Sequence, residues 1–241
     1  MGPGLPTGAQ LEAFRRRPDW PLARPARSLW LSATLHPDWL ASVDFAAAVP
    51  GLQRAGLADD DRAHPEVARR LEAVKRLQPA GITLTAATFK SGEYAQALAG
   101  QVLSTHAAGT LTLLVLNTVE RAQQVLRALQ RLRPAAELVL IHGRFRADDR
   151  RRHEARLDAP RPAAGRIVVA TQCLEAGVDV SARTLFTELA PWASLVQRCG
   201  RCNRHGEYND TADAAVYWLD LADAALAAPY APEALDDARA R

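Results

Sequence analysis

The feature that most constrains the fold is TLTLLVLN at Thr110–Asn117, a stretch in which apolar residues are almost continuous. A strand that is buried on both faces has such a pattern, whereas a strand with one face in water alternates apolar and polar residues. Three similar stretches follow, within ELVLIHGR, RIVVATQ and TLFTEL, each separated from the next by enough residues for a crossover. Strands that alternate with such crossovers predict an α/β fold in which helices flank a parallel sheet.

The segments around these strands carry signals of their own. Thr118 is a good N-cap for a helix that runs to Arg133, where Pro134 stops it. We also expect a helix over Glu93–His106. The alternation of threonine with apolar residues predicts a strand over Ile82–Thr88.

The N-terminal part of the chain gives weaker signals. Met1–Ser28 is rich in proline, glycine and arginine, with one helical pattern at Ala9–Arg17. SLWLSATL at Ser28–Leu35 predicts a buried strand, and His36–Val49 predicts a helix with proline at its first helical position. We expect a further helix inside a longer connection over residues 50–79.

Composition limits the class of protein. Of the 241 residues, 48% are hydrophobic and 24% charged, which excludes disorder of the whole chain. No apolar stretch approaches the roughly 20 residues that a bilayer requires, and the first residues lack the apolar core of a signal peptide. Three cysteines are too few for a disulfide framework, so we expect no membrane association and a cytoplasmic location. The net charge of +3 permits nucleic-acid binding without arguing for it.

Polar residues stand at the carboxyl ends of the predicted strands, which is where parallel sheets bind their ligands. The residues are Asn117, Thr118, His142, Arg144, Thr171, Gln172 and Glu188.

The most specific segment is QRCGRCNR at Gln197–Arg204. If Ser194 caps a helix there, Arg201 and Arg204 lie three residues apart on one helical face, with Gln197 one turn earlier. Two guanidinium groups and an amide that converge in this way suit a phosphate on which charge develops, because arginine stays ionised and presents a fork of donors. On spacing alone, an ordinary solvated basic helix is the stronger interpretation.

A second segment, IVVATQCLEAGVDVSA at Ile167–Ala182, joins a buried strand to a turn that holds Glu175, Gly177 and Asp179. A glycine lets the backbone approach a ligand closely, and a nearby aspartate can hold a ribose hydroxyl or orient an arginine. The alternative is a turn that uses glycine and aspartate as ordinary turn residues. For Glu175 we expect a salt bridge to an arginine of Gln197–Arg204.

Taken in order, these segments resemble the motifs of superfamily 2 helicases. SATL at Ser32–Leu35 is similar to motif III, TLLVLNTVERAQ to motif IV, IHGRF to the motif that follows it, VVATQCLEAGVDVSA to motif V and QRCGRCNRHGE to motif VI. The sequence EAGVDVSA, followed by TELAPWASLVQRCGRCNRHGE, resembles the helicase portion of the type I CRISPR-associated helicase–nuclease. LSATLHPDWLASVDF resembles its U or G subtype. Cys202–Asn203 departs from the Thr–Gly that is commoner in other superfamily 2 helicases.

The resemblance implies a RecA-like fold and a DNA motor that uses ATP with magnesium. Arg201 and Arg204 match the family's arginine fingers and Gln197 its γ-phosphate contact, which makes these three the catalytic candidates. Gly177 and Asp179 match positions that face the nucleotide. The resemblance also implies contacts with single-stranded DNA for Ser32, Thr34, Asn117, Thr118, His142, Arg144, Thr171 and Gln172. Ser32 and Thr34 match the motif that couples the nucleotide state to DNA binding.

Some motifs of the family are not in the sequence. There is no G-x-x-x-x-G-K-[ST], no D-E-x-H or D-E-x-D tetrad and no His-Asp doublet. The resemblance therefore implies that a first RecA-like domain supplies the phosphate cradle and the magnesium ligands, and that a CRISPR surveillance complex is the partner. It divides the chain into a low-order tail or the end of an upstream domain (1–27), a remnant of the first RecA-like domain (28–49), a connection with the first elements of the second domain (50–108), the second RecA-like domain (109–220) and a C-terminal tail (221–241).

Two minor features have alternative interpretations. Cys199, Cys202 and His205, with Cys173, have a spacing that zinc can use, but lone cysteines are usually small buried apolar residues and we expect no metal site. Trp192 is expected to be a packing anchor rather than a platform on which bases stack.

The sequence is also compatible with other functions. The chain could be a fragment of a DNA-repair or recombination helicase, or a non-catalytic nucleic-acid-binding module. CRISPR genes beside the coding sequence, or an upstream reading frame that ends in a P-loop and D-E-x-H, would favour the CRISPR motor.

Overall fold

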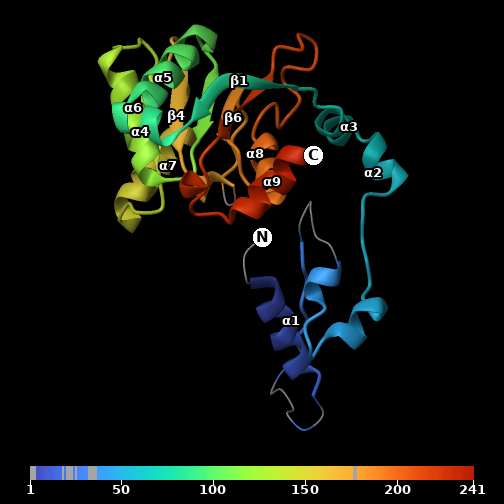
Figure 1. Ribbon diagram of the computed structural model, residues 1–241. Coiled ribbons are helices and arrows are strands. Elements are labelled where there is room, and N and C mark those ends of the chain that lie inside the picture. The colour runs from blue at the N-terminus through green and yellow to red at the C-terminus, as the bar shows by residue number, and fades with distance from the viewer. Residues whose placement is uncertain (1–3, 18, 20–23, 25, 32–36, 176–177) are drawn as a thin grey trace. The chain divides into compact units, whose positions relative to one another are not determined.

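The structure is a computed structural model, and it describes all residues except 1–3, 18, 20–23, 25, 32–36 and 176–177 (Figure 1). The chain divides into two compact units, Met1–Ala58 and Asp59–Arg241. Ser32, Thr34 and Gly177, which the sequence assigned to a DNA or nucleotide site, lie outside the described residues. Among the described residues, no helix is long and apolar enough to cross a membrane.

The larger unit is built on one six-stranded sheet of strand order β1-β6-β5-β2-β4-β3, in which every pair of neighbours is parallel. The predicted α/β fold with a parallel sheet is therefore confirmed. The sequence predicted β2, β3, β4 and β5 but missed β6. The strands are β1 (Arg76–Leu84), β2 (Leu111–Val115), β3 (Glu137–Ile141), β4 (Arg166–Ala170), β5 (Thr184–Glu188) and β6 (Ala215–Leu221).

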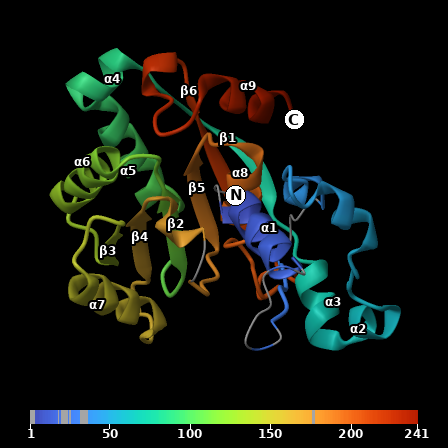
Figure 2. The ribbon, with the colours of Figure 1, turned by 90° about the horizontal axis from the view of Figure 1, so that it is seen from below.

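Helices cover the sheet because its central strands are apolar on both faces. Alternate residues of β2 go to different hydrophobic clusters: Leu114 packs with α5 and α6, and Leu113 packs on the opposite face with the segment that follows β4. Figure 2 shows α5 and α6 together on one side of the strands. The helices of this unit are α2 (Asp59–Ala63), α3 (Pro65–Leu71), α4 (Ala86–Ser91), α5 (Glu93–Thr105), α6 (Val119–Arg131), α7 (Ala147–Asp158), α8 (Trp192–Cys199) and α9 (Pro232–Ala240), with short 3-10 helices η3 (Gln172–Leu174) and η4 (Ala224–Leu226).

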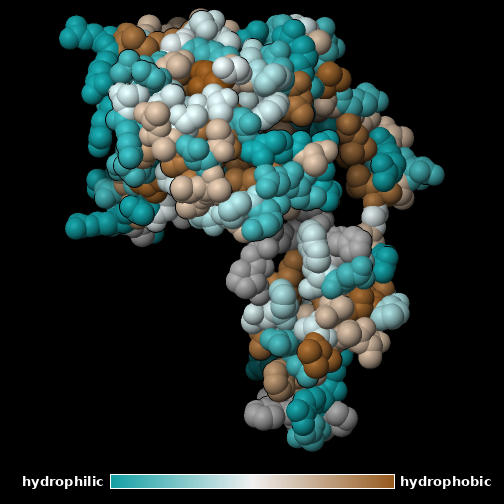
Figure 3. All heavy atoms as spheres, viewed as in Figure 1, coloured by the Kyte–Doolittle hydropathy of each residue, from teal (hydrophilic) through white to brown (hydrophobic). Residues whose placement is uncertain are grey.

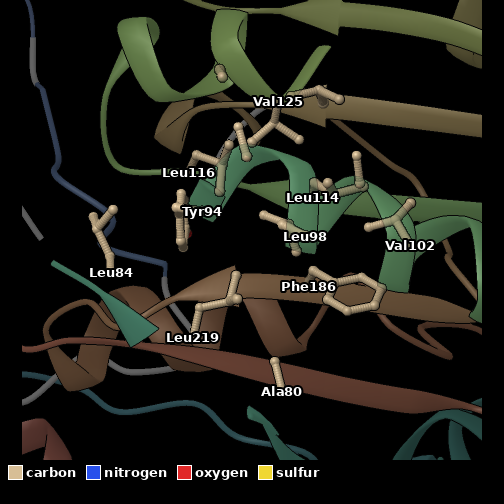
Figure 4. Close-up of a cluster of buried hydrophobic side chains, with 14 of the residues drawn as sticks. Ala80, Leu84, Tyr94, Leu98, Val102, Leu114, Leu116, Val125, Phe186 and Leu219 are labelled. Carbon is tan, nitrogen blue, oxygen red and sulfur yellow. The ribbon is translucent and has the colours of Figure 1, made fainter. Parts of the chain in front are cut away.

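The core between α5, α6 and the sheet contains large side chains that are fully buried. Figure 4 shows Leu98 and Val102 of α5 and Val125 of α6 beside Leu114 and Phe186 of the strands. All five have 0% exposure. Burying a side chain of this size stabilises a fold by about 1.5–3 kcal/mol, so this layer holds the carboxyl ends of the strands in a fixed register.

Threonines begin two of the helices, one where a cap was predicted and one where a strand was predicted. Thr118 caps α6, its hydroxyl accepting a hydrogen bond from the backbone N of Arg121 at 3.3 Å, as predicted. The predicted strand over Ile82–Thr88 is wrong after Leu84, because Thr85 and Thr88 form a capping box that begins α4. Threonine favours both strands and N-caps, and here the cap prevails.

The smaller unit contains α1 (Gly4–Arg15) and two 3-10 helices, η1 (Pro37–Leu40) and η2 (Ala46–Gly51). One continuous helix over residues 36–49 is wrong. Leu40 and Val49 are both buried in the same cluster, but at 3.6 residues per turn they would lie about two and a half turns apart, on opposite sides of a straight helix.

The strand predicted at Ser28–Leu35 is also wrong over Ser28–Leu31, the part that the structure describes. Leu29 and Leu31 are 81% and 83% exposed, and the described residues of this unit offer no neighbouring strand with which to pair. Apolar side chains therefore reach the surface of this unit (Figure 3).

Candidate functional site

Four of the predicted polar positions lie at one edge of the sheet. Because β2, β3, β4 and β5 are parallel neighbours, Asn117, His142, Thr171 and Glu188 come together where these strands end. We call this the carboxyl edge. The sequence predicted this arrangement from the order of the strands alone.

Asn117 is held inside a buried network at this edge. Its backbone N donates to Oε2 of Glu188 at 2.7 Å, and its Nδ2 donates to the carbonyl of Leu189 at 2.8 Å. Its Oδ1 accepts a hydrogen bond from Nη1 of Arg198 at 3.0 Å. Asn117 is 2% exposed, so its side chain positions the loop rather than reaching a ligand.

Glu188 is the acidic centre of this network and is fully buried. Its carboxylate accepts hydrogen bonds from the hydroxyl of Tyr94 at 2.9 Å and from Nη1 of Arg121 at 3.0 Å. Burial and the adjacent Glu188 carboxylate together raise the pKa of Tyr94 well above its usual range, so this phenol stays protonated as a donor.

His142 and Arg144 follow β3 in a loop with a stack of rings. The imidazole of His142 lies 3.9 Å from the ring of Phe145 at an interplanar angle of 8°, and Phe145 lies 4.6 Å from the ring of His153. Nδ1 of His142 accepts a hydrogen bond from the backbone N of Arg144 at 3.3 Å. Burial, with the charge of Arg144 next, lowers the pKa of His142, while the Arg144 side chain is exposed.

Thr171 and Gln172 differ in what they present at the edge. Thr171 is 4% exposed, and its hydroxyl donates to Sγ of Cys173 at 3.6 Å. Gln172, the first residue of η3, is exposed. Among the residues predicted at the carboxyl edge, Gln172 and Arg144 are exposed and Thr118 is half-buried.

The chain after β4 crosses a face of the sheet toward the amino end of β5. Leu174 and Val180 are buried on this face. Glu175 and Asp179 are their neighbours in the chain and are less buried. Glu175 pairs with Arg198 at 2.8 Å, which confirms the predicted salt bridge to an arginine of Gln197–Arg204. Its second carboxylate oxygen accepts a hydrogen bond from the hydroxyl of Ser194 at 3.1 Å.

The helix predicted over the arginine segment has different bounds. α8 begins at Trp192 after Pro191, so Ser194 lies inside the helix and does not cap it. The helix ends at Cys199, and Gly200 follows as its C-cap. Gln197 is a half-buried residue of α8.

Arg201 and Arg204 therefore do not share a helical face, and that prediction is wrong. Beyond Gly200 the backbone bends: Cys202 forms a parallel bridge with Ala182, and Asn203 has a φ of +47°. Asparagine tolerates this left-handed conformation better than most residues. The two arginines are brought together by contacts with the segment after β4 instead.

Arg201 is clamped on the backbone of that segment. Its Nε donates to the carbonyl of Leu174 at 3.1 Å, and its Nη2 donates to the carbonyl of Glu175 at 2.8 Å. Arg201 is 6% exposed. Burial, with the charge of Arg204 next, lowers its pKa, although arginine remains ionised in proteins.

Arg204 is half-exposed and is oriented by a carboxylate. Its Nε donates to Oδ1 of Asp179 at 2.6 Å, and its backbone N donates to the hydroxyl of Ser181 at 2.8 Å. The hydrogen bond from Arg204 is the main cause that lowers the pKa of Asp179. Of the roles that the sequence left open for Asp179, the contact with an arginine is the one that the structure contains.

The cysteines lie close to this segment. Cys202 is fully buried, donates to the carbonyl of Ala215 and has a pKa raised to about 12, mainly by burial. Within the described part of the chain, no group of three or more His, Cys, Asp and Glu side chains could hold a metal ion.

Trp192 is 44% exposed at the start of α8. Its ring lies 5.9 Å from the guanidinium of Arg241, and it borders a cavity of about 620 Å³ between α8, α9 and the sheet.

Sequence reasoning missed the residue that joins these parts. Arg198 lies within QRCGRCNR but received no role from the sequence, yet it contacts both Glu175 and Asn117. Arg121, Tyr94 and Tyr230 of the same network were also missed. A buried arginine gives no sequence signal of its own, because its partners lie far along the chain.

The larger unit, a single parallel sheet flanked by helices, has the RecA-like fold of the solved helicase structures that it resembles. Residues 108–207 match the family described as CRISPR-associated nuclease/helicase Cas3, C-terminal. This part of the chain is therefore similar to the C-terminal helicase domain of that family. The U or G subtype stays a prediction.

Relatives and solved structures agree with this family. The CRISPR-associated helicase Cas3 of Thermoproteus tenax is 33% identical over 111 residues, which cover 45% of this chain and 18% of that protein. The CRISPR-associated endonuclease/helicase Cas3 of Escherichia coli is 36% identical over 104 residues, covering 41% of this chain and 12% of that protein. The chain thus spans less than a fifth of the length of these relatives.

Two solved structures share the fold. The crystal structure of a CRISPR-associated protein has a TM-score of 0.59 at 24% identity and covers 82% of this chain and 24% of its own. The T. fusca Cas3–ADP structure has a TM-score of 0.53 at 22% identity and covers 68% of this chain and 20% of its own.

Proposed function

We propose that this chain supplies the second motor domain of an ATP-dependent DNA helicase that acts in CRISPR antiviral defence. The observation that carries the proposal is the pair Arg201 and Arg204, one clamped on the backbone beside Glu175 and the other held by Asp179. Arginines fixed in this way can stabilise charge on a phosphate during its transfer, at no cost of reorganisation. In this role Gln197, Gly177 and Asp179 would line the nucleotide site.

The nucleotide would be ATP with magnesium, shared with a first RecA-like domain. Arg201 and Arg204 fit the phosphate groups in charge and geometry. Asp179 already serves Arg204, and the sequence contains no P-loop, so the metal ligands and the phosphate cradle would come from that first domain. When bound, the metal would neutralise charge on the phosphates. The names of two solved T. fusca Cas3 structures include ADP and ATP, respectively.

The carboxyl edge would hold single-stranded DNA through its phosphates. Arg144 and Gln172 present exposed side chains there, and Thr118, Thr171 and His142 lie beside them. Asn117 would act through the loop that it positions, since its side chain is buried in hydrogen bonds. Contacts to the backbone alone would make the binding blind to sequence.

The partner in this proposal is a CRISPR surveillance complex that delivers target DNA. The family match supports this assignment. Ser32 and Thr34 stay candidates for coupling nucleotide state to the DNA, as their resemblance to motif III implies.

The test is to compare the chain alone with the chain joined to a first RecA-like domain that carries a P-loop. We expect the joined protein to hydrolyse ATP faster when single-stranded DNA is added. We expect the chain alone to show no turnover, because it has no lysine cradle for the β- and γ-phosphates. DNA-stimulated turnover by the chain alone, abolished by Arg204→Ala, would contradict this division of the site.

A further inference from the structure

Arg198 is the largest of the almost fully buried side chains among the described residues, and all of its guanidinium nitrogens have partners. Nε donates to Oε1 of Glu175 at 2.8 Å. Nη1 donates to Oδ1 of Asn117 at 3.0 Å and to the Thr187 hydroxyl at 3.1 Å. Nη2 donates to the hydroxyl of Tyr230 at 3.0 Å. A guanidinium with these contacts and no exposed surface is closed to a phosphate.

The partners of Arg198 come from the two parts of the proposed site. Asn117 belongs to the carboxyl edge, where DNA would lie, and its backbone N is itself bound by Glu188. Glu175 belongs to the segment on which Arg201 is clamped, through the carbonyl of the same residue. One planar side chain therefore fixes the DNA-facing loop against the backbone that holds an arginine finger.

The charges of this network are balanced and buried. Arg198 and Arg121 face Glu188 and Glu175, and the first three of these are 3% exposed or less. A buried ion pair that loses one partner leaves an uncompensated charge in a medium of low dielectric, so the arrangement resists partial opening. A displacement of Asn117 should therefore be transmitted through Arg198 to Glu175 instead of being absorbed locally.

We propose that Arg198 is a positioning residue that couples the DNA-facing carboxyl edge to the arginine-finger segment, and that it does not contact the nucleotide. The coupling is a property of this chain, whereas its use in a motor rests on the function proposed above. A merely structural arginine would stabilise the fold without linking Asn117 to Glu175.

The coupling can be measured by NMR on the 241-residue chain, from the backbone amide shifts of Asn117 and Thr118. Glu175→Gln removes the charge that faces Arg198 while keeping the shape of the side chain. We expect it to move both amides. The matched control is Glu137→Gln, because Glu137 pairs with the buried Arg166 at the other end of the sheet, at 2.6 Å. The control should leave both amides in place.

Arg198→Lys tests whether the coupling between Glu175 and Asn117 passes through Arg198. A lysine keeps the charge but cannot bridge two partners with a planar fork, so Glu175→Gln in this background should no longer move the amides of Asn117 and Thr118. If Arg198→Lys does not fold, the comparison of Glu175→Gln with Glu137→Gln in the natural sequence decides. Amides that do not respond to Glu175→Gln, or that respond equally to both variants, would overturn the proposal.

A second arm uses an oligothymidylate as the probe and separates this inference from the proposed function. We expect the probe to shift amides at the carboxyl edge and also those of Glu175 and Arg201, and the latter shifts to disappear in Arg198→Lys. A probe that shifts only the carboxyl edge of the natural chain would overturn the coupling but keep DNA binding. No shift by the probe, together with a positive response to Glu175→Gln, would keep the coupling and contradict the DNA role.

Discussion

The two ends of the sheet each contain a buried arginine, and the pair shows how similar contacts can serve different purposes. Arg166 begins β4 and is 2% exposed; its Nε donates to Glu137 at 2.6 Å, and its Nη1 and Nη2 donate to the carbonyls of Ala159 and Pro160. Arg198, near the end of α8, is 1% exposed and also pairs with a carboxylate. In burial and in the number of contacts the two are alike.

They differ in what their partners are. The partners of the Arg166 side chain lie between residues 137 and 160, in the β3–α7–β4 unit that the arginine closes. The partners of Arg198 lie between residues 117 and 230, in segments that face the proposed ligands. The first arginine fastens neighbours along the chain, whereas the second ties together parts that would otherwise meet only through the sheet.

The largest effect that we expect is on stability, and it should be shared by both arginines. Arg166→Met and Arg198→Met each remove a buried guanidinium and leave several hydrogen-bond acceptors without this donor, which should lower the free energy of unfolding by about 1–3 kcal/mol. Urea unfolding of the chain measures this. Arg152→Met is the control, since the side chain of Arg152 is 82% exposed and its ion pair with Asp149 should contribute at most about 1 kcal/mol.

This comparison would be weakened if only one of the two substitutions were destabilising. A small effect for Arg198→Met would mean that water or another donor replaces the guanidinium at Glu175. The network at the carboxyl edge would then be looser than the hydrogen bonds indicate.

The next effect separates the ends of the sheet by function. In the complete motor, Arg204→Ala should reduce ATP turnover by about two decades while DNA binding is retained, because a finger acts on charge that develops in the transition state. Arg204→Lys should restore little, since a point charge lacks the fork of donors. Steady-state hydrolysis with saturating single-stranded DNA measures this.

Arg166→Lys is the control for this prediction. It changes a buried arginine whose side chain contacts none of the residues proposed to hold nucleotide or DNA, and it should leave turnover unchanged under conditions where the protein is folded. Normal hydrolysis by Arg204→Ala in a protein that binds DNA would mean that the segment after α8 is purely structural.

Much of the larger unit follows from the sequence, because buried parallel strands and well-capped helices are local patterns. The apolar stretch at Thr110–Asn117 gave β2, and Thr118 gave the start of α6. β6 was missed although its sequence, AVYWLDL, is largely apolar, since it follows a polar connection that no motif marks. The parallel order of the strands then placed the carboxyl edge correctly.

The geometry of the arginine segment could not be predicted in the same way. Helical spacing suggested one face for Arg201 and Arg204, but Gly200 ends α8 and the bridge between Ala182 and Cys202 redirects the chain. These are long-range contacts, as are those of Arg198. A motif shows which residue types recur together, and only the fold shows whether each faces a ligand or the interior.

A smaller effect should distinguish the edges in DNA binding. Arg144→Ala removes an exposed cation from the carboxyl edge, and the affinity for an oligothymidylate should fall several-fold, with the salt dependence reduced by about 0.7 in slope for one lost phosphate contact. Arg131→Ala is the control, because this exposed arginine ends α6 at the opposite edge. Fluorescence anisotropy at several salt concentrations measures both.

An equal loss for Arg144→Ala and Arg131→Ala would mean that DNA is attracted by the net charge of the chain. The carboxyl edge would then have no special role in binding. A salt-independent affinity would argue against phosphate contacts at either edge.

The smallest effect concerns pH. Burial and the charge of Arg144 lower the pKa of His142, and its Nδ1 can accept the hydrogen bond from the Arg144 backbone only while the ring is neutral. The unfolded chain therefore takes up this proton at a higher pH than the folded one. Stability from His142 is fully present above pH 6.5 or so and is lost as the pH falls below it. A ring titration by NMR should give a midpoint below that of a free histidine.

Arg144→Ala offers the check on cause. Removing this positive charge, while keeping the backbone N that donates to the ring, should raise the midpoint of His142 toward that of a free histidine without restoring it fully, because burial is the larger cause. A midpoint at the free value in the natural chain would mean that the imidazole is exposed to solvent. The stack of His142 on Phe145 would then not close this loop, and the carboxyl edge would be less ordered here than beside Asn117.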